Sequence, residues 1–105
     1  MPQFVLMYVG GNPPETPEEG QRNFARYKQW LDDLGDVAVS PGNPLMNTRT
    51  VHPQGHVTEG SQTTASGYTI VECEDMEAAL TIAQACPFLD TGGALEVSQL
   101  GKMPG

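Results

Sequence analysis

Arg49 is the residue whose type and position most directly suggest ligand chemistry. The sequence holds 5 basic and 13 acidic residues, and the other basic residues are Arg22, Arg26, Lys28 and Lys102. Arg49 is therefore the fixed cation of the long segment between positions 29 and 101. Because arginine donates a bidentate pair of hydrogen bonds to a carboxylate, we expect Arg49 to bind any small organic acid held there. The alternative is an ordinary surface arginine.

Histidine is the next chemically versatile residue, and both histidines, His52 and His56, flank a Pro-Gln-Gly turn. Imidazole titrates near neutral pH, so either ring could serve as a general base or a metal ligand. A metal site needs three or four close ligands, whereas Glu59 is the one oxygen ligand nearby in the sequence. The pattern favours exposed turn histidines, with no metal and no cofactor. No nucleophile or phosphate-loop motif accompanies them, so the catalytic residues stay unknown.

Aromatic and acidic side chains on the expected strands form a third group of candidates. Strand alternation puts Tyr68 and Glu72 on one face of the sheet. If Leu95 and Val97 face the helices, Glu96 points away from them, toward a cavity between two subunits. A carboxylate buried there would have a raised pKa and could act as a base, whereas a solvated rim position is the alternative. The ligand-binding candidates are Arg49, Tyr8, Tyr68, Glu72, Glu96 and Trp30.

The acidic balance of the chain limits its partners and its location. The formal net charge is −8 and the isoelectric point is near 4.4, which argues against binding nucleic acid or an anionic membrane surface. No apolar run approaches the ~18–20 residues of a membrane span, and we expect a cytoplasmic protein. Cys73 and Cys86 fit that expectation as buried free thiols, because a helix between them would hold them roughly 18 Å apart.

The first third of the chain predicts a strand followed by a helix. Residues 4–9 are a short apolar run that ends at a Gly-Gly-Asn-Pro-Pro turn, as in a buried central strand. Thr16 then begins a capping box, with Pro17 at the first helical position, and Gly35 ends the helix. The apolar stripe of this helix has Trp30 beside it and consists of Phe24, Tyr27, Leu31 and Leu34.

The rest of the chain predicts a second strand and helix after a poorly patterned middle. A strand at 67–73 leads to a helix that Asp75 caps and Pro87 ends, and a last strand covers 94–98. The expected buried face of that helix holds Met76, Ala79, Leu80, Ala83 and Cys86. The middle is expected to hold a short strand at 36–39, a turn at 41–44, weak strand character at 45–51, a returning strand at 56–58 and a mobile loop at 60–66.

This order of elements predicts one α+β domain spanning residues 1–105. Strand, helix, strand or hairpin, strand, helix and strand make the ferredoxin-like βαββαβ arrangement with an antiparallel sheet. Two helices can cover one apolar face of such a sheet. The simplest cover for the other face is a second copy of the chain, so we expect a homodimer.

Several motifs of the chain form a recognisable set. They are the first strand ending in Tyr8 before Gly10-Gly11, the strand Gly67-Tyr68-Thr69-Ile70-Val71-Glu72, the turn Cys86-Pro87-Phe88-Leu89 and the segment Gly92-Gly93-Ala94-Leu95-Glu96-Val97. Together they resemble the YCII-related (DGPF-type) family, over nearly the whole chain. The resemblance implies a dimeric α+β barrel.

The chain departs from that family at two places that bear on activity. Glu59-Gly60-Ser61 stands where the family's Asp-Gly-Pro-Phe element would fall. Family members proposed to be enzymes carry a histidine on the first helix and an aspartate nearby, but residues 16–35 contain no histidine. The proposed acid and base pair therefore does not carry over to this chain.

Three functions fit these observations. The first is a dimeric, small-molecule-binding or accessory protein that takes a small organic acid or aromatic metabolite. The second is a small, cofactor-free lyase or isomerase, acting on lactones or chlorinated aromatic compounds, with a glutamate or histidine base and Arg49 on a carboxylate. The third is a structural or protein-interaction module. The missing helix histidine favours the first.

Overall fold

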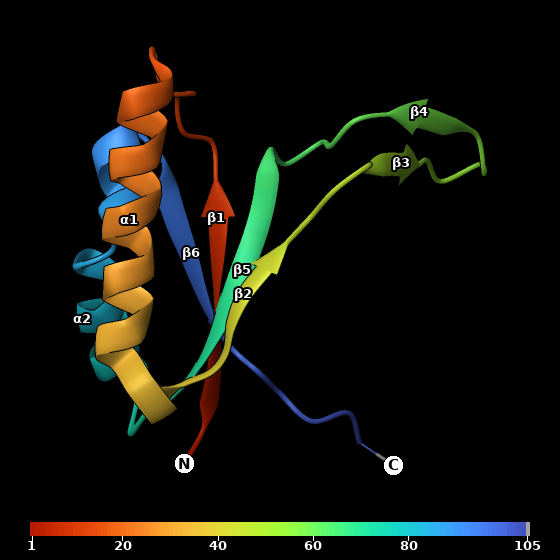
Figure 1. The fold of residues 1–105 in the computed structure, drawn as a ribbon. Helices are drawn as coiled ribbons and strands as arrows, with labels where there is room; N and C mark the ends of the chain where they lie inside the picture. Colours follow the sequence, from red (N-terminus) through yellow and green to blue (C-terminus); the bar gives the residue numbers. More distant parts are fainter. Residues whose placement is uncertain (105) are drawn as a thin grey trace.

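The computed structural model describes residues 1–104, which form a four-stranded antiparallel sheet, a pair of α-helices and a separate two-stranded hairpin (Figure 1). The α+β class and the antiparallel sheet predicted from the sequence are confirmed. In chain order the elements are β1 (Gln3–Val9), α1 (Pro17–Leu34), the 3-10 helix η1 (Gly35–Val37), β2 (Ala38–Pro44), β3 (Arg49–Val51), β4 (Val57–Glu59), β5 (Ala65–Glu72), α2 (Met76–Gln84), the 3-10 helix η2 (Pro87–Thr91) and β6 (Ala94–Gln99).

The apolar first strand lies inside the sheet, as its composition predicts. The strand order is β2-β5-β1-β6, so β1 pairs antiparallel with β5 on one side and β6 on the other. Leu6 of β1 stands opposite both Thr69 and Val97. The short strands β3 and β4 pair only with each other and form an arm that projects away from the sheet (Figure 1).

The hydrophobic core lies between the sheet and the helices. Alternation along β1 and β5 puts Phe4, Leu6 and Val71 on the helix side, where each is fully buried. Ala79 and Ala83 of α2 pack against them. Leu95 and Val97 also pack against this core, which confirms that Glu96 points to the other face. The helical spacing of Phe24 and Leu80 predicts buried positions for both, but both side chains are exposed.

Both helices begin where the sequence predicts, at a side-chain cap. The Oγ1 of Thr16 accepts a hydrogen bond from the Glu19 backbone N–H at 3.1 Å, and Pro17 occupies the first turn. The Glu19 carboxylate reaches back to the backbone N–H of Glu15 at 3.3 Å, one residue before the expected partner. At α2, Asp75 accepts from the N–H of Ala78 at 2.9 Å.

The segment 41–44 differs from the sequence expectation, because it belongs to β2 rather than to a turn. Strand β2 keeps its place beside β5 through two register shifts around Ser40, since neither Pro41 nor Pro44 has an N–H to donate. The Asn43 side-chain amide replaces part of the missing ladder and donates to the Tyr68 carbonyl at 3.2 Å. The weak strand expected at 45–51 is shortened to β3.

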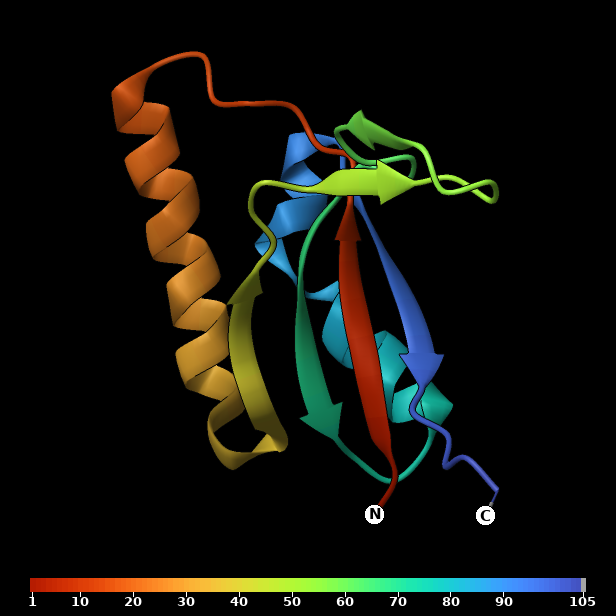
Figure 2. The same ribbon diagram turned by 90° about the vertical axis from the view of Figure 1, so that its right-hand side faces the viewer.

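The second face of the sheet carries Val5, Met7, Tyr68 and Ile70, and neither helix covers it. Figure 2 looks onto this face, with α2 behind the sheet, α1 beside β2 and the β3–β4 arm crossing one end. Within residues 1–104, no helix has the length and apolar character needed to cross a membrane.

Candidate functional site

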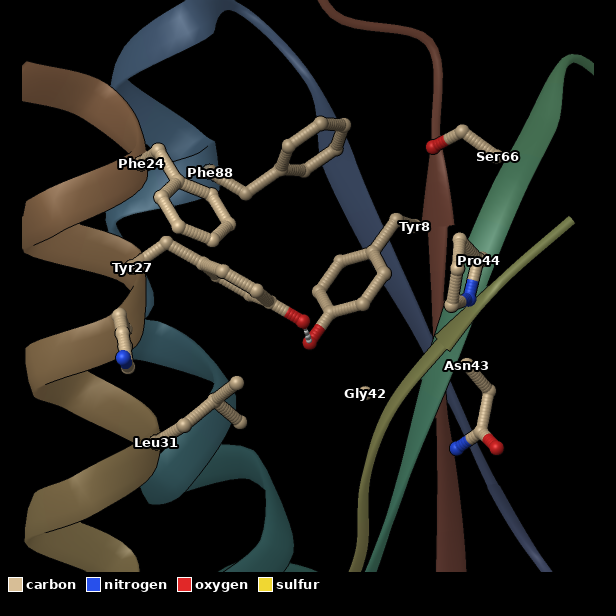
Figure 3. Close-up of a pocket in the computed structure, with 11 residues that line it drawn as sticks. Tyr8, Phe24, Tyr27, Leu31, Gly42, Asn43, Pro44, Ser66 and Phe88 are labelled. Atoms are coloured by element: carbon tan, nitrogen blue, oxygen red, sulfur yellow. Dashed lines mark hydrogen bonds between the residues drawn. The ribbon is translucent and has the colours of Figure 1, made fainter. Parts of the chain in front are cut away.

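A pocket opens between α1 and the sheet because the amino-terminal half of α1 does not pack on the core. Its volume is about 490 Å³, and its lining is almost entirely apolar (Figure 3). The lining residues come from α1, β1, β2, β5 and η2, and they are Tyr8, Phe24, Tyr27, Lys28, Leu31, Gly42, Asn43, Pro44, Ser66, Gly67 and Phe88. The site is therefore built at the edge of the helix layer, where β2 ends.

Four aromatic rings form much of the wall. Tyr8 of β1 meets Phe88 of η2 edge to face, with ring centroids 5.3 Å apart. It meets Tyr27 of α1 in the same way at 5.6 Å. Phe24, one turn before Tyr27 on α1, supplies the fourth ring (Figure 3). Its side chain is 65% exposed. Exposed aromatic surface of this kind is typical of a binding pocket for an apolar molecule.

A chain of hydroxyl groups runs behind this aromatic wall. The Tyr27 hydroxyl donates to the Tyr8 hydroxyl at 2.9 Å, and the Tyr8 hydroxyl lies 2.5 Å from the Thr69 Oγ1. Thr69 in turn donates to the backbone carbonyl of Pro41 at 2.5 Å. Burial raises the pKa of Tyr8 far above its ordinary value, because the phenolate form would lose its hydration. Tyr8 is therefore a neutral hydrogen-bonding group and not a base.

Lys28 is the basic residue among those that line the pocket. Arg26, two residues earlier on α1, forms an ion pair with Asp90 of η2. Within residues 1–104, Lys28 has no carboxylate within 4.0 Å, including that of Asp32, with which the helix spacing would pair it. Its ammonium group is thus available to an acidic substituent of a ligand.

The candidates named from the sequence lie in four separate places. Tyr8 lines the pocket, and Trp30 lies in the core, with its ring centroid 6.0 Å from that of Tyr27. Tyr68, Glu72 and Glu96 share the opposite, uncovered face of the sheet. Glu72 accepts a hydrogen bond there from Gln3 at 3.1 Å.

Arg49 lies on the projecting arm, far in the fold from the aromatic pocket. Its side chain is 68% exposed and its Nε lies 3.9 Å from a carboxylate oxygen of Glu59, its partner across the hairpin. The rings of His52 and His56 stack at the turn of the same arm, with centroids 4.3 Å apart. In the part of the chain that the structure describes, no three histidine, cysteine or acidic side chains gather as a metal site.

Apart from Tyr8, the residues that line the pocket were not among the candidates named from the sequence. Phe24 has the spacing of a core residue, but the helix turns it toward the pocket instead. Lys28 has the spacing of a solvated face, and Phe88 follows a proline that ends a helix. A usable signal was present, since Phe24, Tyr27 and Lys28 fall within two turns of one helix.

Comparison with known proteins identifies the fold. The family model described as the YCII-related domain matches residues 3–101. A search of curated proteins found no match. Among solved structures, the chain is similar to 5-chloro-2-hydroxyhydroquinone dehydrochlorinase (TftG) from Burkholderia phenoliruptrix AC1100, in a complex with 2,5-dihydroxybenzoquinone. The TM-score is 0.58 and the identity 19%, over 93% of each chain. At that identity the likeness concerns the fold.

Proposed function

The chain belongs to the YCII-related family, and from this premise we propose that it binds a small aromatic molecule in the pocket between α1 and the sheet. The observation that carries the proposal is the aromatic wall formed by Tyr8, Phe24, Tyr27 and Phe88. A flat ring can stack on or meet these rings at their edges, and its transfer from water buries apolar surface on both partners. A pocket of about 490 Å³ has room for a fused two-ring compound.

The proposed ligand also carries an acidic group that Lys28 can hold. A protein with a net charge of −8 repels anions in general, so an acidic ligand needs a cation at the site itself. Arg26 and Arg49 each have a carboxylate partner. Lys28 on the pocket lining therefore takes the part that the sequence analysis gave to Arg49.

We further propose that the protein is a homodimer, formed through the uncovered face of the sheet. Val5, Met7 and Ile70 on that face are apolar, and they are only half-buried in a single chain. Burying them against a second copy would remove this surface from water. Free, buried thiols at Cys73 and Cys86 support a reducing compartment such as the cytoplasm, and the net negative charge argues against nucleic acid and anionic membranes as partners.

The alternative function is a cofactor-free lyase, such as a dehydrochlorinase. The similar fold of TftG, which bears that name and was solved with a hydroxylated quinone, favours this alternative. Such a reaction needs a base beside the substrate. The titratable side chains of the pocket lining are Tyr8, Tyr27 and Lys28, and burial keeps Tyr8 neutral. The pocket therefore supports binding better than it supports elimination.

Titration of ¹⁵N-labelled protein with 2-naphthol, followed by NMR, tests the proposal. We expect shifts of backbone signals in α1, η2 and the end of β2, and none confined to the β3–β4 arm. Phe24→Ala should weaken binding roughly three- to tenfold, because it removes one aromatic wall. It should leave the melting temperature unchanged or raised, because the ring is already 65% exposed and alanine favours helix.

Leu80→Ala on α2 is the matched control, since Leu80 is also an exposed helix residue but lies outside the pocket. For the acidic group, Lys28→Met should weaken binding of 2-naphthoate while leaving 2-naphthol binding nearly unchanged. The proposal is wrong if millimolar 2-naphthol shifts no pocket signal, or if Phe24→Ala and Leu80→Ala behave alike.

A further inference from the structure

We propose that the Tyr27 hydroxyl selects ligands that donate an O–H group, so that the pocket prefers phenols to aromatic ethers and ketones. This inference rests on the proposed function, because it concerns which aromatic molecules the same pocket accepts. It follows from the direction in which protons must lie along the hydroxyl chain behind the aromatic wall.

The direction of the chain is fixed at its inner end. The carbonyl oxygen of Pro41 has no proton, so Thr69 must donate its single hydroxyl proton to Pro41 across the 2.5 Å contact. The Thr69 oxygen can then only accept from Tyr8, which lies 2.5 Å away. Tyr8 has thereby used its own proton, and its oxygen accepts the proton of Tyr27 at 2.9 Å. One backbone carbonyl thus orients three side-chain hydroxyls.

The Tyr27 hydroxyl, at the outer end of this row of hydroxyl groups, can therefore accept a hydrogen bond but has no proton left to donate. A tyrosine hydroxyl carries one proton and can accept at its oxygen lone pairs. The proton of Tyr27 points to Tyr8, so the Tyr27 oxygen can offer a ligand only its lone pairs. Burial holds Tyr8 in its neutral form, which keeps its proton in place toward Thr69. A ligand oxygen that lacks a proton would meet another oxygen at this position with no hydrogen bond between them.

Of the polar side chains that line the pocket, Asn43 and Lys28 do not supply the missing donor. The side-chain amide of Asn43 donates to Ser40 and to the Tyr68 carbonyl, so its N–H groups are already used. Lys28 donates from the surface of α1 and suits an acidic group rather than a neutral ether. The ligand class that suits both the Tyr27 hydroxyl and Lys28 is therefore a hydroxylated aromatic ring. If the ring also carries an acidic substituent, that substituent would reach Lys28.

The test compares 2-naphthol with its methyl ether, 2-methoxynaphthalene, on the unmodified protein by the same NMR titration. Both probes have the same rings, but only the naphthol donates a proton. We expect the naphthol to bind roughly three- to tenfold more tightly, the value of one hydrogen bond. Equal binding of the two probes overturns the inference while leaving the proposed function intact. If neither probe binds, both proposals fail.

The variant Tyr8→Phe gives a more specific test of the inference. Without the Tyr8 oxygen, the proton of Tyr27 loses its acceptor and becomes available to the ligand. Binding of the methyl ether should then become roughly three- to tenfold tighter than in the unmodified protein, and the preference for naphthol should fall to about one. A gain in affinity of this kind would not arise from damage to the fold.

Two further variants complete the design. Tyr8→Phe combined with Tyr27→Phe should bind both probes as the unmodified protein binds the ether, because no hydroxyl remains on the wall. Tyr68→Phe is the matched control, since Tyr68 lies on β5 but faces the opposite side of the sheet, and it should keep the original preference. Retention of the naphthol preference in the double variant would overturn the assignment to Tyr27.

Discussion

Among single residues, the buried thiol of Cys86 predicts a dependence of stability on pH. Its side chain is 2% exposed and belongs to the hydrophobic core. Burial raises the pKa of the Cys86 thiol to about 11, because the thiolate would be poorly hydrated there. The folded state therefore holds this proton more tightly than the unfolded chain does.

The sign of the pH dependence follows from linkage. Below the unfolded thiol's pKa, roughly 8.5, both states are protonated and the group leaves stability unchanged. Between there and about 11 the unfolded chain loses the proton first, so the free energy of unfolding should fall with rising pH. Urea unfolding at pH 7 and pH 10 should show this loss, on the order of 1–2 kcal/mol from Cys86.

Cys86→Ala is the variant that isolates the thiol. It should lower stability at pH 7 by creating a small cavity, yet part of the loss between pH 7 and pH 10 should disappear. Tyr8 also has a raised pKa and should contribute the remaining loss at the highest pH values. An identical loss in the variant and the unmodified protein would contradict the role of Cys86.

The pocket shows how far single residues can be read from sequence. Tyr8 was named as a candidate because it lies on a predicted strand, and the structure places it on the pocket lining. Lys28 was overlooked, because helix spacing pairs it with Asp32 on a solvated face. Only the angle at which α1 leaves the sheet makes Lys28 part of a site, and that angle depends on contacts distant in sequence.

Among the elements, α1 combines an anchored end with a loosely held one. Its carboxyl-terminal half packs through Trp30, which is 8% exposed, and through the half-buried Tyr27, Leu31 and Leu34. Its amino-terminal half presents the exposed Phe24 to the pocket and is tied down mainly by its cap. The helix therefore holds the pocket wall on its less stable half.

Hydrogen exchange should reveal this difference within α1. Amides of residues 21–25 should exchange faster than those of residues 29–33, since local opening needs to break fewer buried contacts there. Added 2-naphthol should slow the faster group more than the slower group, because the ligand packs on Phe24 and Tyr27. Uniform exchange along the helix, measured by NMR on the same sample, would contradict this picture.

Element boundaries were predictable where local chemistry decides them. The capping residues Thr16 and Asp75 and the stop at Gly35 act within one turn of helix, and all three stand where the sequence placed them. Strand β2 was partly mistaken for a turn, because its prolines signal a break. Pairing with β5, about 25 residues later in the chain, overrides that local signal.

At the scale of the whole molecule, a single chain is unusually open for its size. Its radius of gyration is 15.3 Å, whereas a compact domain of this length has about 13 Å. The smallest extent is only 18 Å, against 47 Å for the largest. The uncovered sheet face and the projecting arm account for this shape (Figure 2).

The proposed homodimer predicts a solution mass of twice the 11.3 kDa of the chain by size exclusion with light scattering. Met7→Lys or Ile70→Lys should shift the protein to the monomer, because each buries an unpaired ammonium group in the proposed interface. Thr81→Lys, on the exposed surface of α2, is the control and should stay dimeric. A monomer in the unmodified protein would refute the proposed dimer.

The order of strands in the sheet also affects how the chain folds during its synthesis. Strand β1 lies between β5 and β6, both of which are synthesised long after it. Until residue 72 has emerged, the apolar run of residues 4–9 has no strand to pair with. A nascent chain that ends before β5 therefore exposes this apolar segment, and we expect a chaperone to bind there.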